Sequence, residues 1–312
     1  MAKILVYGSL NIDYVYQMPH FVQPGETLLA LSRQEFAGGK GLNQAVALAK
    51  AGGDVYFQGA VGKEDGKLLL QVLTDNHIDL TYVKERDAMA SGHTVIQVDP
   101  NGQNCILLFG GSNHSHTHAE IDECLSHFSA GDYLVLQNET NDVDYVIAKA
   151  ADSGLKVCVN VSPLNDAILK MPLDRCEYLI VNEIEGSALV DEKEGADPYL
   201  ILNKLKAKFP QSSFLLTLGS KGSLLSLAHQ DEVIACKAYK RQAVDTTAAG
   251  DTFLGYFVAQ ISANIDPRTA LQRATAASAI AVTRKGAVPS IPAIDEVLSF
   301  VKEQGSTLVD KL

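Results

Sequence analysis

The order of apolar and polar positions along the chain predicts strands that alternate with helices. Short apolar runs that end in polar or glycine residues predict buried strands at KILVYGS, DVYFQGAVG, DYLVLQNE, KVCVNVSP, YLIVNEIE and SFLLTLGSKG. Segments with helical spacing of apolar residues lie between several of them, as in LNQAVALAKAGG and DGKLLLQVLTDNHI. This alternation is typical of a doubly wound, mainly parallel α/β sheet with helices on both faces.

Two segments do not fit the alternation, residues 12–37 and 93–109. The first contains YVYQM, a QPGET turn and LLALSRQEFAGG, and the second reads as two strands joined by a Pro-Asn-Gly turn. Together they predict a small antiparallel sheet, a β-lid over the carboxyl edge of the main sheet, where open α/β sheets bind ligands. No repeat or linker divides the chain, so we expect residues 1–312 to form a single domain.

Composition and charge narrow the function classes. The chain has 312 residues, of which 46% are hydrophobic and 20% charged, with a net charge of −11. No block of Lys or Arg offers a surface for nucleic acid, and no apolar run approaches a membrane span or a signal-peptide core. The five cysteines are odd in number and form no CxxC pair, which predicts buried free thiols in a cytoplasmic protein.

The segment DTTAAGDTF, residues 245–253, is the strongest candidate for chemistry. It precedes an apolar helical stretch, so Ala-Ala-Gly-Asp would form the first helical turn, whose backbone N–H groups lack intrahelical acceptors. Small side chains let an anion approach these donors, and Asp251 would be an ionised base beside it. That combination suits phosphoryl transfer. Taken alone, the segment is also compatible with a helix cap and small residues used for packing.

Other nucleotide motifs are absent or weak. The sequence has no GxxxxGK[ST], and GGKGLNQ lacks the third glycine of a dinucleotide fingerprint. The first strand ends in YGSLNID rather than in a glycine-rich turn, which disfavours a dehydrogenase.

DTTAAGDTF is very similar to the signature of the ribokinase-like (PfkB) sugar kinases. GGKGLNQA resembles the N-terminal signature of this family, and AVTRKGAVPSIP (281–292) resembles the segment that follows its catalytic helix. The resemblance implies a ribokinase-like fold and ATP-dependent phosphorylation of the primary hydroxyl of a small sugar, with ribose foremost. A nucleoside kinase or another sugar kinase of the family remains an alternative. A sugar-binding protein without catalysis is a third reading, disfavoured by the intact Asp251 and AAG.

The resemblance also implies roles for individual residues. Asp251 would be the general base, with an anion hole formed by Ala248, Ala249 and Gly250. The sugar site would comprise Asp251 and Asn11, Asp13, Gly39, Lys40, Asn43 and Glu139. The ATP site would comprise Asn182, Thr217, Gly219, Gly222, Ala249 and Gly250. Mg²⁺ would be held through water by Asn182 and Glu185, and K⁺ by Asp245, Thr247, Ala281, Arg284, Gly286 and Ser290. Alone, several of these residues would read as turns, caps or solvated side chains.

Remaining features bear on specificity and assembly. HSHTH, with His114, His116 and His118, reads as a solvated loop rather than a metal site. In the lid, His93 and Gln97 stand where the family carries smaller or aliphatic residues, and these polar side chains could change which sugar hydroxyls are recognised. Tyr14, Tyr16, Phe36 or Phe109 could stack on the base of a nucleoside. NVSP (160–163) stands where ribokinases usually show NPAP. Exposed lid strands could pair two copies into a homodimer.

Overall fold

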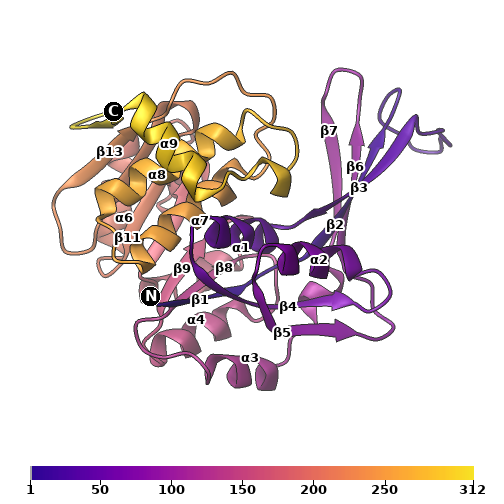
Figure 1. Cartoon of the computed structure of the whole chain (residues 1–312), viewed down its shortest axis with the longest axis horizontal. Coiled ribbons are helices and arrows are strands. Elements are labelled where there is room, and N and C mark those ends of the chain that lie inside the picture. Colours follow the sequence, from indigo (N-terminus) through magenta and orange to yellow (C-terminus); the bar gives the residue numbers. More distant parts are fainter. Residues whose placement is uncertain (1) are drawn as a thin grey trace.

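The computed structural model describes residues 2–312, and its main sheet has ten strands (Figure 1). Their order is β14-β13-β12-β11-β10-β9-β8-β1-β4-β5. From β5 to β11 all neighbours are parallel, and β12, β13 and β14 extend the sheet in antiparallel fashion. The strands are β1 (Lys3–Tyr7), β4 (Asp54–Gly62), β5 (Asp79–Arg86), β8 (Tyr133–Gln137), β9 (Lys156–Asn160), β10 (Tyr178–Asn182), β11 (Ser213–Thr217), β12 (Gly222–Ser226), β13 (Val233–Lys237) and β14 (Leu308–Val309). The predicted doubly wound, mainly parallel sheet is confirmed.

Helices cover both faces of this sheet, and each layer encloses its own apolar core. Alternate side chains of β1 enter different cores, because successive residues of a strand point to opposite faces. Ile4 and Val6 pack in one core and Leu5 and Tyr7 in the other. The first core is covered by α1 (Lys40–Lys50), α2 (Lys67–Asp75), α7 (Ala249–Ser262), α8 (Pro267–Ala281) and α9 (Ile294–Gln304). The second is covered by α3 (His118–Leu125), α4 (Val143–Asp152), α5 (Glu183–Leu189) and α6 (Pro198–Lys208).

A second, four-stranded sheet projects from the body as the predicted lid (Figure 1). Its order is β3-β2-β6-β7, and its strands are β2 (Asn11–Gln17), β3 (Ser32–Gly38), β6 (Gly92–Val98) and β7 (Asn104–Phe109). The prediction that this sheet is antiparallel is wrong at its centre, where β2 and β6 run parallel. The reason is that β2 follows β1 and β6 follows β5. Since β1 and β5 are parallel strands of the main sheet, the chain leaves both at the same edge and runs outward in the same direction.

Two close approaches between backbones hold α1 in place. A Cβ built at Gly41, in the first turn of α1, would lie 2.4 Å from Ser9 N and 2.6 Å from Gly8 Cα, so only glycine lets α1 approach the end of β1. A Cβ built at Gly255 in α7 would lie 2.5 Å from Ala47 Cβ in α1. The first turn of α1 is therefore packed tightly against β1, and its second half against α7.

The cysteine prediction needs one correction. All five cysteines are free, but Cys105 is exposed on β7 because the lid edge has no covering layer; the other four are buried. Within residues 2–312, no helix has the length and apolar character that crossing a membrane requires. The cytoplasmic location and the single-domain organisation stay predictions.

Candidate active site

Asp251 lies in the first turn of α7 and is buried between that helix and α1. Its Oδ2 accepts a hydrogen bond from Asn43 Nδ2 at 3.1 Å, and its Oδ1 accepts one from Gln44 Nε2 at 2.9 Å. Both carboxylate oxygens are therefore held by side-chain amide donors from α1. Of the two donors, only Asn43 was predicted.

The turn before Asp251 leaves open space. Ala248 has a left-handed backbone with φ of 58°, and α7 begins at Ala249. A Cβ built at Gly250 meets no other atom of residues 2–312 within 4 Å, so protein packing does not require glycine here. The first N–H groups of a helix have no intrahelical acceptor and lie at the positive end of its dipole. An anion can therefore reach the backbone at Gly250.

Glu139, two residues after β8, places its carboxylate against the first residue of α1. Glu139 Oε2 accepts hydrogen bonds from Ser9 Oγ at 2.5 Å and from Lys40 N at 3.2 Å. Burial raises the pKa of Glu139, opposed by the charge of Lys40 and the bond from Ser9, and the nearby charge of Asp251 raises it further. Lys40, Glu139 and Asp251 thus share one electrostatic environment. Ser9 was not predicted.

Asn11 and Asp13 occupy the base of the lid. Asn11 Oδ1 accepts from Asn113 Nδ2 at 2.7 Å, and Asp13 Oδ1 accepts from Thr94 Oγ1 at 2.6 Å. Burial raises the pKa of Asp13, and the bond from Thr94 partly opposes the increase. A Cβ at Gly38 would lie 2.1 Å from Asp13 Oδ2, so the missing side chain makes room for the carboxylate.

Neither partner of these two residues was predicted. Thr94 pairs with Asp13 in the β2–β6 register, a pairing that could be found only by knowing that the two strands are neighbours. Asn113 lies in a short 3-10 helix, Gly111–His114, and the sequence around it carries no signal for a buried amide. Gly39, with φ of 96°, lies against Ser9 and Asn11 and joins the lid to the start of α1.

A cavity of about 610 Å³ opens at the N-terminus of α7. Five residues predicted for ATP line it: Thr217, Gly219, Gly222, Ala249 and Gly250. Asn182, predicted with them, is not among the lining residues. The cavity also takes in residues that the sequence did not point to, namely Ala238, Tyr239, Lys240, Arg241, Ala243, Phe253, Thr275, Ser278, Ala279 and Val282. Its positively charged side chains are those of Lys240 and Arg241.

Asn182 and Glu185 form a reciprocal cap at the start of α5. Asn182 Oδ1 accepts from Glu185 N at 2.8 Å, and Asn182 N donates to Glu185 Oε2 at 2.9 Å. The structural role weighed for this pair is therefore present. It leaves Glu185 Oε1 and the exposed Asn182 side chain for further contacts.

Asp245 ties together two loops beside the helix start. Its Oδ1 accepts from Thr247 N at 2.9 Å and from Thr247 Oγ1 at 2.6 Å, and its Oδ2 accepts from Gly286 N at 2.9 Å. Burial raises the pKa of Asp245, but the three hydrogen bonds and Lys285 outweigh it and the pKa is lowered. In the second loop, Arg284 N donates to Ala281 O, and Ser290 Oγ donates to Ala287 O.

The histidine prediction holds only in part. His114 and His118 are exposed, but His116 is buried, with its ring 5.0 Å from that of Tyr7. Burial lowers the pKa of His116 to about 4. The solvated-loop prediction is thus wrong for His116, because β1 supplies an aromatic neighbour from far along the chain. No cluster of His, Cys, Asp and Glu suited to a metal occurs in residues 2–312.

The lid face presented by His93 also differs from expectation. Because His93 pairs with Ile12 while Thr94 pairs with Asp13, His93 and Asp13 lie on opposite faces of the lid. The His93 ring contacts Tyr14 and Phe109 there. Its side chain therefore does not face Asp13, and a direct role in reading hydroxyls is not supported.

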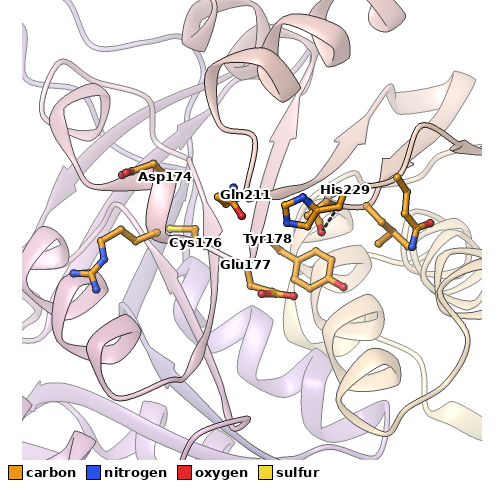
Figure 2. Close-up of a pocket in the computed structure, with 11 residues that line it drawn as sticks. Asp174, Cys176, Glu177, Tyr178, Gln211 and His229 are labelled. Atoms are coloured by element: carbon orange, nitrogen blue, oxygen red, sulfur yellow. Dashed lines mark hydrogen bonds between the residues drawn. The ribbon is translucent and has the colours of Figure 1, made fainter.

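A second hollow of about 520 Å³ lies at the opposite edge of the main sheet (Figure 2). It is lined by residues before and at the start of β10 and β11, including Glu177, Tyr178 and Gln211, with His229 across from them. None of the predicted site residues lines it. Ligands of open α/β sheets bind at the carboxyl ends of the strands, so the Asp251 edge is the candidate site.

Comparison with known proteins agrees with this geometry. The family model for pfkB family carbohydrate kinases matches residues 1–294. The ribokinase of Haemophilus influenzae is 33% identical, over 97% of this chain and 99% of its own length. The structure resembles Arabidopsis thaliana ribokinase complexed with ribose and ATP (TM-score 0.86, 30% identity, 96% of this chain and 99% of that one). It also resembles Cryptococcus neoformans ribokinase in complex with ADP (TM-score 0.85, 31% identity, 96% and 99%). The predicted ATP-dependent sugar kinase is confirmed, and the chain belongs to the pfkB family of carbohydrate kinases.

Proposed function

We propose that this kinase transfers the γ-phosphoryl group of ATP to the primary hydroxyl of ribose and forms ribose 5-phosphate. The observation that carries the proposal is the position of Asp251. It directly follows Ala249 and Gly250, which line the cavity shared with Thr217, and on its other side it interacts electrostatically with the buried Glu139. The similarity to ribokinases along nearly the whole chain supports ribose as the acceptor.

In this mechanism Asp251 accepts the proton of the sugar hydroxyl as its oxygen attacks the γ-phosphorus. The new P–O bond forms while the bond from the γ-phosphorus to the bridging oxygen breaks, and ADP leaves with that electron pair. The backbone N–H of Gly250 stabilises charge on the transferring group, helped by the dipole of α7, whereas Ala249 N donates to Thr246 O at 3.2 Å. Asn43 and Gln44 each donate to one oxygen of the Asp251 carboxylate and hold its orientation.

The sugar side offers both hydrogen-bond donors and acceptors. Asp13 and Glu139 present carboxylates, and Lys40 presents an ammonium group near Glu139. Asn43 Oδ1 is buried and has no partner among residues 2–312, which leaves it free to accept from a hydroxyl. A polyol needs many such partners, since an unpaired buried polar group costs about 1–3 kcal/mol.

Two cations fit the residues present. Glu185 and Asn182 offer the carboxylate and amide oxygens that suit a hydrated Mg²⁺, which would neutralise phosphate charge when bound. For K⁺ we infer a site between the two loops that Asp245 joins. Its members would be Thr247, Ala281 at the end of α8, Arg284, Gly286 and Ser290. The lowered pKa of Asp245 keeps its carboxylate charged, and hard oxygen donors suit an alkali cation. Such an ion would stiffen the segment that leads to Ala248.

A screen of ADP release over pentoses, 2-deoxyribose, hexoses, sugar phosphates and nucleosides tests the proposal, with Mg²⁺ and K⁺ present. Ribose should give the highest kcat/KM, and the product should carry phosphate at the primary carbon by phosphorus NMR. A preference for nucleosides would instead favour base stacking on the lid, where Phe36 pairs with Asp13 and therefore shares its face. Sugar binding without ADP release would favour a non-catalytic protein.

We also infer that the lid joins two copies of this chain. All six residues of β7 are exposed, including Ile106, Leu107 and Leu108, and β7 is one of the two edge strands of its sheet. An unpaired apolar edge promotes strand pairing, and antiparallel pairing of β7 with itself satisfies a two-fold axis. Light scattering should give a dimer that Leu107→Lys weakens. A monomer at micromolar concentration would contradict the inference.

A further inference from the structure

Three buried polar side chains form a line that ends on Asp251. Gln137 Nε2 donates to Gln44 Oε1 at 2.7 Å, and Gln44 Nε2 donates to Asp251 Oδ1 at 2.9 Å. Gln44 and Gln137 are 0% and 1% exposed. They come from α1 and from the last position of β8, so three separate elements meet at this carboxylate.

The hydrogen bonds fix the orientation of the Gln44 amide. Because Gln137 donates to its oxygen, the nitrogen of Gln44 must face Asp251. The reverse orientation would place an amide oxygen against a carboxylate oxygen in a buried environment, where such repulsion is strong. Gln137 thus determines which end of Gln44 the base encounters.

Burying an amide costs free energy unless all of its polar atoms are hydrogen-bonded, and apolar side chains of similar size would fill the same space. Gln137 Oε1 has no partner within residues 2–312, so this pair is not an ideally satisfied structural network. The glycine contacts described above allow α1 to pack closely against the end of β1 and against α7. Gly41 allows the approach to β1, and Gly255 allows the approach to α7.

We propose that Gln44 is a positioning residue that holds Asp251 in its reactive rotamer, and that Gln137 acts through Gln44. The proposal rests on the proposed role of Asp251 as the base. Asn43 also binds the carboxylate, because its Nδ2 donates to Asp251 Oδ2. Asn43 Oδ1, however, has no partner in the part of the chain that the structure describes and is assigned above to the sugar. Gln44 has no such second task, because its oxygen is occupied by Gln137.

Other charges near the base must be considered in any pH experiment. Glu139 after β8 interacts with Asp251, and Lys40 at the start of α1 interacts with Glu139. On β2, Asp13 is bound to Thr94. Arg273 of α8 binds Gln260 toward the other end of α7. None of these groups is changed by substituting the two glutamines, so a shift in the titration of Asp251 reports the lost donor.

The test compares Gln44→Met, Gln137→Met and the double variant with Gln260→Met as a matched control. Gln260 is a buried glutamine as well, but it belongs to α7, donates to Ala51 O and lies away from the base. For Gln44→Met we expect kcat to fall about tenfold to a hundredfold while the KM for ATP stays within threefold, because a misaimed base loses rate rather than nucleotide binding. Gln137→Met should show a smaller loss of the same kind.

The pH profile of kcat separates positioning from a general loss of structure. Loss of a hydrogen-bond donor disfavours the charged form of a carboxylate, so the acid limb of the kcat profile should move to higher pH in Gln44→Met. The double variant should match Gln44→Met, since Gln137 acts only through Gln44. The control should keep the native profile even where its melting temperature falls.

An unshifted acid limb, or a loss of kcat no larger than that of Gln260→Met, would overturn the proposal. Should Gln44→Met fail to fold, Gln137→Met decides the matter, since it leaves every direct contact of Asp251 in place. A native profile in Gln137→Met would then reject the relay. Asp251→Asn serves as the reference for the base itself. If that variant turns over normally, the proposed function fails, whereas an inactive Asp251→Asn beside a native Gln44→Met profile rejects only the relay.

Discussion

Replacing Gly255 with alanine should push α7 away from α1 and displace Asp251, the proposed base at the start of α7. The added Cβ would lie 2.5 Å from Ala47 Cβ and 2.9 Å from Leu48 N. Carbon atoms in contact are normally about 3.5–4.0 Å apart, so the two helices must separate by about 1 Å. Rotation of a side chain cannot relieve the contact, because the atoms met are a Cβ and backbone.

The separation has two measurable consequences. Overpacking typically costs about 1–3 kcal/mol, and the better helix propensity of alanine returns up to about 1 kcal/mol, so the free energy of unfolding should fall by about 1–2 kcal/mol. The bonds from Asn43 and Gln44 to Asp251, now 3.1 Å and 2.9 Å, would lengthen to about 4 Å, beyond hydrogen-bonding range. A 1 Å misplacement of this kind can cost about a hundredfold in kcat.

Gly250→Ala provides the matched comparison on the same helix. Its Cβ meets no atom of residues 2–312 within 4 Å, so the variant should be as stable as the native chain or slightly more stable. It should nevertheless lose turnover, because the methyl group occupies the space left for the transferring phosphoryl group. Urea unfolding gives the two free energies, and steady-state ADP release gives kcat and the KM for ATP.

The opposite outcome for either variant refutes this reasoning. A Gly255→Ala protein with native stability and native kcat would show that the α1–α7 contact does not set the position of Asp251. A Gly250→Ala protein with native turnover would show that no phosphoryl group passes close to that backbone.

Three further predictions concern other groups. Asp13→Ala should weaken the Kd for ribose about tenfold to a hundredfold, with the Kd for ATP unchanged in the same calorimetric titrations, since charged hydrogen bonds contribute roughly 1.5–3 kcal/mol; an unchanged ribose Kd would move the sugar site elsewhere. K⁺ should activate the native enzyme over Na⁺ and tetramethylammonium at equal ionic strength and have little effect on Asp245→Ala, and equal native rates in all three salts would remove the cation site. Arg86 lowers the pKa of Glu120 from 4.5 to about 2, chiefly through its hydrogen bonds, so the stability from Glu120 is present above about pH 4.5 and lost as pH falls toward 2. Glu120→Gln should therefore lower the free energy of unfolding at pH 7 by about 1–2 kcal/mol, allowing for solvent screening, and flatten its decline between about pH 4.5 and 2 in acid titrations; an unchanged acid profile would contradict this.

The sequence was most informative where chemistry and secondary structure coincide locally. The small residues before Asp251 and the apolar stretch behind it are contiguous, so a helix start could be predicted without tertiary information. The same is true of the strands of the main sheet, whose apolar runs are continuous because parallel strands are buried on both faces. The approach of an anion to Gly250 could likewise be predicted from the small residues around it, whereas Gly219 was assigned only through the family resemblance.

Features that depend on pairing between distant segments could not be predicted. Gln44 and Gln137 are 93 residues apart, and their contact exists only once β8 lies beside β1 and α1 packs above them. Thr94 and His93 are adjacent, and the side that each presents depends on the register of β6 with β2. A residue pattern fixes the alternation of faces within a strand, but the neighbouring strand decides which face meets the site.

The central claim is that Asp251 is the base for the acceptor hydroxyl, and the kcat of Asp251→Asn with ribose and ATP tests it most directly. Asparagine keeps the shape of the side chain, so ribose and ATP should still bind in calorimetry and circular dichroism should be native. Because a positioned general base contributes about 10²–10⁴ in rate, kcat should fall by at least about a hundredfold. A folded Asp251→Asn protein that loses less than about fivefold in kcat would contradict the account.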